Sequence, residues 1–596
     1  MHLPRMSVIL TISIIFQYCL LFNDNFIQSL FIKEDTNDIM ESLMVSRRHD
    51  SFIFGKEFIV EVVLGKELKR LVLFKTFRKV IKRSIEFWSR IMRPKVPPKR
   101  PIKLERACEH RTRSNLIPHK HYCIGGCKSK TFYNGIEIRE RYLQDCLSSE
   151  EDVMNYENEI TESPKHHFLL FLTANDRMCG LTGLAAEYTY NQDPDTDRPL
   201  AAVIVFCRAI RFLSSNPIHL KHILLHELAH AFGFSFNMFP YLRYDDDKTV
   251  NNGLPAEDNT IVYVKRKWHS AKENNNYERI SLTLRSVVNF ARNHFRCDKL
   301  TSVDLESDGT RGTHSMHFER RLAIGELMAG YVDIMPATSN LTLNYFKDTG
   351  WYHVKLSMAD PWKWGEGLGC DFVFLSCRSY MQKRKMNNQP ISPWCDHIIG
   401  YGDSCLPYTN AYGTCNMVKF VGQLKSHHVH FNQSVNSTDD VQVTFGGLDT
   451  LADRCPFLTP LTHVNGQEKN SHCGDINNRK YENFNDVQNL QYYGKASRCF
   501  RYGTTYYNEP HHNAYRAGCY QIKCTSSFKL SIQFHGEWFT CPREGGEIKV
   551  AKDTTSEDWI QCPPYDEFCS VKKTRERKRR VESNQIEDYL RSGNNI

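Results

Sequence analysis

The chain has 596 residues, of which 41% are hydrophobic and 24% are charged. This length supports two or three domains, each with ample core. The formal net charge of +9 is modest for this length and no nucleic-acid-binding motif accompanies it, so we do not expect nucleic acid as a partner.

The N-terminus carries a mostly apolar run over residues 8–22. About fifteen residues is short for a membrane span and suits the core of a signal peptide. We therefore predict a signal peptide over 1–22, a short pro or linker segment over 23–50, and a secreted product; an uncleaved N-terminal membrane anchor is the alternative. Removal of the signal takes Cys19 with it and leaves 20 of the 21 cysteines, an even number that suits disulfides.

Residues 51–240 are predicted to form an α/β subdomain. The strand-like runs are short, apolar and rich in β-branched residues. They lie at 51–54, 58–64, 167–173 and 201–206. The apolar positions between residues 69 and 92 follow near-helical spacing and predict a helix.

The most informative motif is His226-Glu-Leu-Ala-His230, followed by Ala-Phe-Gly233. Two histidines four apart on a helix project from one face, so both can bind one zinc ion with Glu227 beside them as general base. The preceding run, 218–225, is apolar enough for a buried helix, and Gly233 suits its C-terminal cap. This segment closes the predicted N-terminal catalytic subdomain.

A zinc peptidase needs a third protein ligand, with the fourth position left to water. In the compact zinc-binding pattern His-Glu-x-x-His-x-x-Gly-x-x-His, the third ligand lies six residues after the second histidine. Here that position is Phe236, which cannot bind metal. The third ligand must lie elsewhere, and residues 312–330 offer two candidates, His314 and His317. Residues alone leave that choice open.

Residues 241–369 are predicted to hold an insertion and a central subdomain. Residues 241–275 are polar and charged with little periodicity, which indicates an exposed insertion, and 279–295 predict a helix that returns the chain towards the site. Asn340, Asn432 and Asn436 each begin an Asn-x-Ser/Thr glycosylation motif.

Thirteen cysteines lie between residues 370 and 569. They predict a disulfide-stapled, loop- and strand-rich C-terminal domain over 370–570. A second metal site built from these cysteines is disfavoured, because no Cys-x-x-Cys pair occurs there. The tail, 571–596, is basic and then polar; we expect it to be disordered, with a furin-type cleavage site or a patch for acidic glycans as the alternative, and we expect no GPI anchor.

Together, the zinc-helix motif and residues 312–330 resemble the leishmanolysin family of metzincin zinc peptidases, and within it the invadolysin (leishmanolysin-like) branch. That family separates its third histidine from the helix by a long insertion and follows it with a basic stretch and Glu-Leu-Met. Because His317 precedes Met328 by the family's eleven residues, the resemblance implies His317 as the third ligand and Met328 as the Met-turn residue. Glu326 is then a structural partner. The resemblance extends to 77–88, 104–108, 195–202, 293–297, 348–352 and 364–373.

The resemblance implies an α+β fold: a metzincin-type catalytic domain with a mixed sheet and a zinc-binding active-site helix, followed by the disulfide-rich C-terminal domain. It also implies a disulfide between Cys297 and Cys370. The expected protein is a secreted monomeric zinc endopeptidase with one Zn²⁺ per chain. Its partners would be protein or peptide substrates, such as extracellular matrix or host proteins. The alternative is a secreted binding or adhesion protein of the same fold, with dispensable catalysis.

Two departures from the family stand out. The usual longer prodomain with an inhibitory cysteine is missing between the apolar run and residue 51, so latency by a cysteine switch is not supported. The branch's Ala-Ala-His-Cys run is replaced by Ala185-Ala-Glu-Tyr188, which indicates that one family disulfide is rearranged. A disulfide between Cys179 and Cys207 is the possible substitute.

Overall fold

The structure is a computed structural model that describes residues 51–569 with short gaps. The gaps fall at residues 72, 118–119, 159–163, 176–184, 190, 208–216, 244–259, 310–312, 397–403, 423, 433–442, 462–469, 482–490, 507–513, 535 and 553–555. The predicted signal peptide (1–22), the linker (23–50) and the tail (571–596) therefore lie outside the described residues. Within the described ranges, no helix is both long and apolar enough to cross a membrane.

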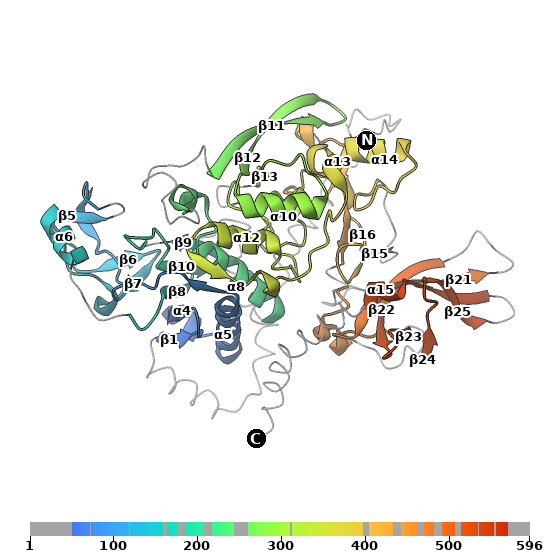
Figure 1. The fold of residues 1–596 in the computed structure, drawn as a ribbon, viewed down its shortest axis with the longest axis horizontal. Helices are drawn as coiled ribbons and strands as arrows, with labels where there is room; N and C mark the ends of the chain where they lie inside the picture. The colour runs from blue at the N-terminus through green and yellow to red at the C-terminus, as the bar shows by residue number, and fades with distance from the viewer. Residues whose placement is uncertain are drawn as a thin grey trace, which may run out of the picture.

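A five-stranded mixed sheet, ordered β1-β2-β8-β10-β9, organises the N-terminal half (Figure 1). The inner strands β2, β8 and β10 are parallel, and the outer strands β1 and β9 run antiparallel to them. Nearly every side chain of β8 and β10 is buried, as expected for inner strands covered on both faces. The strands are β1 (Ser51–Phe54), β2 (Val60–Leu64), β8 (Phe168–Ala174), β9 (Ala185–Thr189) and β10 (Ala201–Phe206). The strands predicted at 51–54, 58–64, 167–173 and 201–206 are confirmed within two residues.

Two helices, α5 (Phe74–Ile91) and α8 (Pro217–Ala231), share one hydrophobic core with the alternate residues of this sheet. Trp88 of α5 is fully buried and donates its indole N–H to the Leu225 carbonyl of α8, 3.1 Å away. The helix predicted at 69–92 corresponds to α5, which begins five residues later than predicted, after the short α4 (Lys66–Lys69). The opposite face of the sheet packs on a separate cluster that includes Ile102 and Tyr142.

The chain between β2 and β8 also forms small elements. They are β3 (Met92–Pro94), β4 (Cys108–Arg113), β5 (His121–Cys127), β6 (Thr131–Tyr133), β7 (Ile136–Ile138), η1 (Glu140–Tyr142) and α6 (Glu150–Asn158). Two disulfides join this region, Cys108–Cys123 and Cys127–Cys146. The segment is thus stapled rather than built around a large core.

The central region corrects one prediction. Part of the stretch predicted as an exposed insertion forms β11 (Ile261–His269), which pairs with β12 (Asn274–Leu282) in a long hairpin. Ile261 and Trp268 are buried. The helix predicted at 279–295 begins later, as α10 (Arg285–Phe295). The remaining elements are η2 (Phe236–Tyr241), β13 (Val303–Asp304), α11 (Arg320–Ala323), α12 (Asn340–Asp348), β14 (Tyr352–Val354) and η3 (Leu356–Met358).

The last third of the described chain is mainly strands. It begins with two helices, α13 (Gly369–Phe374) and α14 (Cys377–Met386), and ends with a six-stranded sheet ordered β24-β23-β22-β21-β26-β25. Figure 1 shows this last sheet at the right end of the molecule, well separated from the five-stranded sheet, which lies left of centre. The other elements are β15 (Ser404–Cys405), β16 (Tyr412–Cys415), β17 (Met417–Val421), η4 (Ser426–His428), β18 (Phe431–Asn432), β19 (Val443–Gly447), β20 (Leu458–Pro460), η5 (Ile476–Tyr481), β21 (Ser497–Tyr506), β22 (Ala514–Cys524), β23 (Leu530–Phe534), β24 (Glu537–Thr540), β25 (Gly546–Lys552), β26 (Ser556–Cys562) and α15 (Tyr565–Phe568).

Disulfides link the described cysteines of this region. They are Cys297–Cys370, Cys377–Cys455, Cys395–Cys415, Cys405–Cys499, Cys473–Cys519, Cys524–Cys569 and Cys541–Cys562. Cys207 is also disulfide-bonded, but Cys179 lies outside the described residues, so that pairing stays a prediction. The main core runs on through Phe372 and Trp394 to Phe457, so it does not break at residue 370.

Candidate metal centre

Helix α8 carries His226 and His230 one turn apart and ends in a glycine turn. Gly233 has φ +117°, a conformation that glycine adopts without strain. Its N–H donates to the His230 carbonyl at 2.9 Å, and the Phe234 N–H donates to the Ala229 carbonyl at 3.0 Å. This pair of hydrogen bonds is the Schellman termination of a helix. The turn directs the Phe234 carbonyl back towards the helix, where it accepts a hydrogen bond from His230 Nδ1 at 2.6 Å.

Three imidazoles meet at this helix. The Nε2 atom of His317 lies 3.0 Å from Nε2 of His226 and 3.1 Å from Nε2 of His230, and the last two atoms are 3.1 Å apart. All three side chains are about 5–6% exposed. The structure therefore brings together the three histidines that the sequence analysis put forward as ligands.

The arrangement of these rings fits a bound cation. Each Nδ1 faces a backbone carbonyl oxygen, that of Leu327 at 2.6 Å for His226 and that of Thr313 at 3.0 Å for His317. A carbonyl only accepts, so each Nδ1 carries the hydrogen and each Nε2 is left with a lone pair. Three lone pairs facing one another at this distance repel unless a cation lies between them. Ligand nitrogens about 2.0–2.1 Å from one tetrahedral ion would be about 3.3 Å apart, close to the observed spacing.

Burial also keeps these imidazoles neutral. It lowers the pKa of His230 to about 4 and that of His317 to about 3, and the neighbouring His230 adds to the effect on His317. The pKa of His226 lies well below its ordinary value, because of burial first and the other two histidines second. Neutral imidazole is the form that binds a metal ion.

Glu227 follows His226 directly on α8 and is buried, with 8% of its surface exposed. A carboxylate is seldom this buried unless it is paired or serves a site. Glu227 lies between the two helix histidines in the sequence, on the same buried part of α8.

The loop that carries His317 is held by Glu306, a residue that the sequence analysis missed. The Glu306 carboxylate accepts hydrogen bonds from the backbone N–H groups of Asp308 at 2.9 Å and Arg320 at 3.2 Å. Its own backbone N–H donates to the His317 carbonyl at 2.9 Å. Burial and the nearby Glu319 raise the pKa of Glu306 to about 10. The alternation of acidic residues at 304, 306 and 308 was the available sequence signal.

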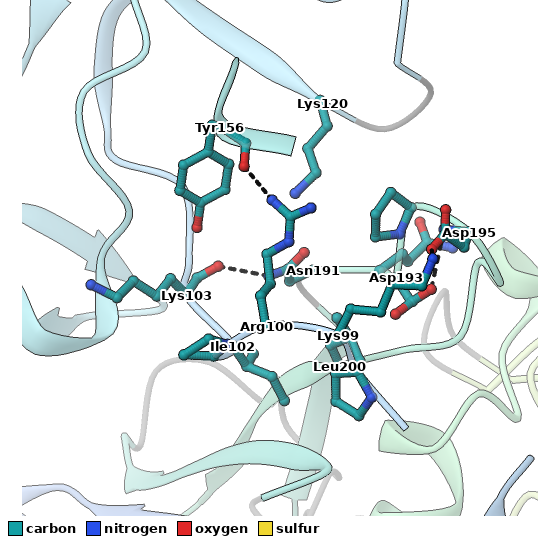
Figure 2. A pocket seen from close by; sticks show the side chains of 14 residues that line it. Lys99, Arg100, Ile102, Lys103, Lys120, Tyr156, Asn191, Asp193, Asp195 and Leu200 are labelled. Carbon is teal, nitrogen blue, oxygen red and sulfur yellow. Dashed lines mark hydrogen bonds and ion pairs between the residues drawn. The ribbon is translucent and has the colours of Figure 1, made fainter. Parts of the chain in front are cut away.

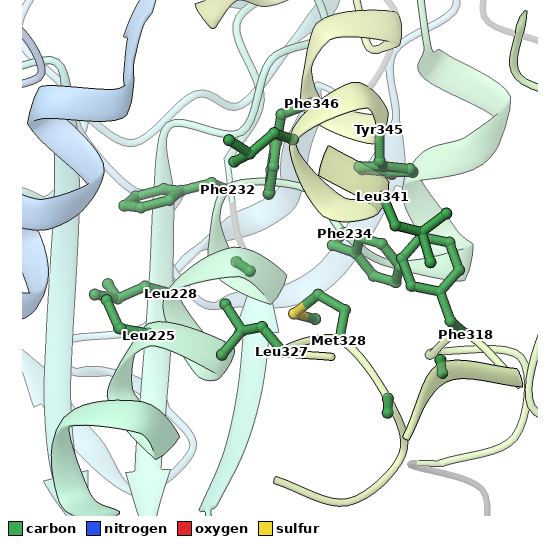
Figure 3. Packing of buried hydrophobic residues seen from close by; sticks show 14 of the residues in the cluster. Leu225, Leu228, Phe232, Phe234, Phe318, Leu327, Met328, Leu341, Tyr345 and Phe346 are labelled. Atoms are coloured by element: carbon green, nitrogen blue, oxygen red, sulfur yellow. The ribbon is translucent and has the colours of Figure 1, made fainter. Parts of the chain in front are cut away.

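Met328 lies in the main apolar cluster and directly follows Leu327, whose carbonyl accepts the hydrogen bond from His226 Nδ1. It is fully buried and shares this cluster with Leu228 and Phe318 (Figure 3). Glu326 fixes the preceding turn: one carboxylate oxygen accepts from the Met328 N–H at 2.5 Å, and the other from the Thr342 hydroxyl at 2.7 Å. Burial raises the pKa of Glu326 to about 7. Glu326 therefore has the contacts of a structural partner that joins the turn to α12.

The other candidate residues lie elsewhere. His314 is exposed, and its Nδ1 contacts the Ser315 hydroxyl at 2.8 Å, so it is not part of the histidine cluster. Among the glycosylation motifs, Asn340 is half-buried at the start of α12, with its Oδ1 atom buried. Asn432 lies on β18, and Asn436 falls outside the described residues.

A pocket of about 430 Å³ lies in the N-terminal region and does not involve the histidines (Figure 2). Two of its basic residues already have partners in the protein: Lys99 forms an ion pair with Asp195 at 2.6 Å, and Arg100 donates to the Tyr156 carbonyl. This pocket is therefore separate from the metal centre, since none of the three clustered histidines lines it.

Three neutral histidines around a common point, two of them on a helix with a buried glutamate between them, define a metallopeptidase centre. Residues 160–575 match the leishmanolysin family, and the chain belongs to that family. It is thus a metalloendopeptidase, and the expected mixed α/β fold with many disulfides is confirmed.

Two proteins named leishmanolysin-like peptidase are similar to this chain over most of its length. It is 28% identical to a leishmanolysin-like peptidase of Caenorhabditis elegans over 533 residues, which span 82% of this chain and 79% of that protein. A leishmanolysin-like peptidase of Drosophila melanogaster is 26% identical over 83% of this chain and 77% of its own length. Leishmanolysin of Leishmania major is 25% identical over 58% of this chain and 51% of its own length.

Proposed function

We propose that this chain is a secreted, metzincin-type zinc endopeptidase that cleaves extracellular proteins, with Glu227 as general base. The observation that carries the proposal is the trio of buried Nε2 atoms, 3.0–3.1 Å apart, beside a buried glutamate. A binding protein with lost catalysis would not need to keep this arrangement.

His226, His230 and His317 would hold the ion. Three neutral imidazoles with one open position are a ligand set of catalytic zinc. When bound, zinc supplies Lewis acidity, which lowers the pKa of a water molecule and polarises the carbonyl of the scissile bond. The carbonyls of Leu327, Phe234 and Thr313 orient the three rings through their Nδ1 atoms and raise their basicity as ligands.

Glu227 would move the proton. As general base it accepts a proton from the attacking water, and as general acid it returns that proton to the leaving amine. Its burial excludes bulk water from the carboxylate and strengthens its electrostatic effect on the site.

The substrate would bind as an extended strand. Among the described strands, β9 is one of the two outer strands of the five-stranded sheet, and it is the one that lies against α8. An outer strand can pair with an extended peptide through main-chain hydrogen bonds. This mode of binding places few demands on side chains, so we expect broad cleavage rather than one strict sequence.

Secretion is supported by the cysteine chemistry of the described residues. Disulfides persist in oxidising compartments, and those of the C-terminal region tie together segments as far apart as Cys405 and Cys499. N-terminal sequencing of protein collected from medium tests this, and a start near residue 23 is the expected result. A protein retained in the cytosol with free thiols would contradict it.

The activity is tested with the purified full chain and a quenched fluorescent peptide. We expect cleavage by the wild type, restoration of activity by Zn²⁺ after chelation, and a loss of about 10²–10⁴-fold in Glu227→Gln. Glu227→Gln should still bind zinc, because its three imidazoles are unchanged. A folded, zinc-loaded wild type that cleaves no peptide would instead favour the binding-protein alternative.

A further inference from the structure

A second group of metal-binding side chains lies outside the histidine centre. Asp308 Oδ2 and His428 Nε2 are 3.1 Å apart, and the His427 ring centroid is 4.1 Å from that of His428. Each of these three residues presents one ligand atom, and the three atoms lie within 4.8 Å of one another. One carboxylate and two imidazoles form a ligand set that first-row transition metals bind.

The backbone holds these residues in place from two distant parts of the chain. Asp308 lies in the loop between β13 and His317, and its N–H donates to the Glu306 carboxylate. The two histidines end η4 (Ser426–His428), where the His427 carbonyl accepts the Trp268 indole N–H at 2.9 Å. A preorganised backbone reduces the entropy that a ligand must order on binding.

Burial and exposure suit a metal site with an open side. His428 and Asp308 are 3% and 9% exposed, and His427 is half-buried. Water can therefore reach the cluster past His427 and complete the coordination of an ion. Burial first, and the neighbouring His428 second, lower the pKa of His427, which favours its neutral form.

A plain hydrogen bond between Asp308 and His428 is the simpler interpretation. Lys425 also approaches, with its Nζ 3.5 Å from Asp308 Oδ1, but its side chain is 67% exposed and can move away. Neither contact needs His427. A metal ion would need it, and this difference separates the two interpretations.

We propose that Asp308, His427 and His428 bind a second divalent transition-metal ion of the zinc type, in addition to the ion at the His226 centre. Such an ion would fasten the C-terminal segment that carries η4 to the loop that carries His317. Gly309, the neighbour of Asp308, lies close to Thr313: a Cβ atom added at Gly309 would be 2.9 Å from the Thr313 Cβ. The carbonyl of Thr313 is the group that orients His317.

The test is the number of zinc ions bound per full-length chain in a zinc-buffered solution, measured by equilibrium dialysis and elemental analysis. We expect two ions for the wild type, one for His427→Ala and two for the control His314→Ala, which removes a nearby exposed histidine. A wild type that binds one ion, or a His427→Ala variant that still binds two, overturns the proposal.

A second measurement guards against a variant that fails to fold. In the background of His226→Ala, which disables the first centre, added zinc should raise the melting temperature. The same zinc should give no shift once His427→Ala is added, with circular dichroism unchanged between the two proteins. An equal zinc-dependent shift in both proteins would assign the stabilisation to another site and overturn the proposal.

Discussion

Arg279 and Asp453 lie 174 residues apart in the sequence and form a two-pronged ion pair, in which Arg279 Nη2 is 2.9 and 3.1 Å from the two carboxylate oxygens of Asp453. Arg279 Nη1 also donates to Glu319 at 2.8 Å. Glu319 stands two residues after His317. The hairpin, the loop of the third histidine and the C-terminal region therefore meet in one buried network of charges.

Removal of Asp453 should destabilise this network. Arg321 Nε also lies 3.3 Å from Asp453 Oδ2, so in Asp453→Ala the buried Arg279 and Arg321 would lose a common partner. An uncompensated buried charge costs about 3–5 kcal/mol. We expect the free energy of unfolding to fall by this amount and zinc affinity to fall with it, because Glu319 adjoins the loop of His317. Urea unfolding and zinc titration measure the two effects.

The matched control is Asp195→Asn, which breaks the ion pair with Lys99 at the surface, where both side chains are more than half exposed. Exposed pairs contribute little to stability, so neither unfolding nor zinc binding should change. Equal effects of the two substitutions would show that the buried network has no special role.

The third ligand can be tested by one pair of neighbouring substitutions. His317→Ala should lose the zinc of the first centre and with it all peptidase activity, since two imidazoles and water hold zinc far more weakly than three. His314→Ala should keep both, because the exposed His314 lies outside the cluster. Zinc content per chain, measured beside cleavage rate, decides between them. The reverse pattern would make His314 the ligand.

Local patterns predicted the elements that build the centre, but not the contacts that support it. The apolar run and Gly233 predicted α8 and its end, and the strand predicted at 201–206 matches β10. The residues by themselves did not decide between His314 and His317. The contact that decides it joins His317 to His226, which is 91 residues away in the sequence. Glu306 and Asp453 act through similarly distant partners, which no local pattern reveals.

The β11–β12 hairpin shows why a strand with a charged residue on its inner face is difficult to predict from sequence. Tyr263, Lys265 and Lys267 of β11 point outwards and alternate with more buried positions. One of those inner positions is Arg266, which pairs with Asp304 at 2.7 Å. A charged residue on the inner face interrupts the apolar alternation by which a strand is identified, so the segment resembled an exposed insertion.

Gly233→Ala should weaken both the fold and the metal centre. A Cβ atom at this position would lie 2.6 Å from Trp351 Cζ3, and φ +117° is unfavourable for alanine. We expect about 1–3 kcal/mol of destabilisation from overpacking, beyond the backbone strain. Displacement of the Phe234 carbonyl would also free His230 and lower zinc affinity.

Gly536→Ala is the control for this effect, because Gly536 has φ +84° but no atom within 4 Å of an added Cβ. It should show the backbone strain alone and leave zinc affinity unchanged. Thermal unfolding and competition with a zinc chelator measure the two quantities. If both variants bound zinc as tightly as the wild type, the glycine turn would have no part in orienting His230.

Acid should destabilise the protein through His472, which is 5% exposed. Burial lowers the pKa of His472 from 6.5 to about 4, although Asp333 and Asp475 oppose the shift. Between these two pH values the unfolded chain binds more protons than the folded one, so stability falls as the pH falls through this window. At pH 5 the loss from this group relative to pH 7 is about 2 kcal/mol.

Substitution of His472 by glutamine should remove this part of the pH dependence. The difference in unfolding free energy between pH 7 and pH 5 should shrink by about 2 kcal/mol relative to the wild type, even if the variant is less stable at pH 7. Urea unfolding at both pH values, with the same zinc concentration, measures that difference directly. His353→Gln, which replaces an exposed histidine on β14, should leave the difference as it is in the wild type; an identical change in both variants would assign the effect to something other than the burial of His472.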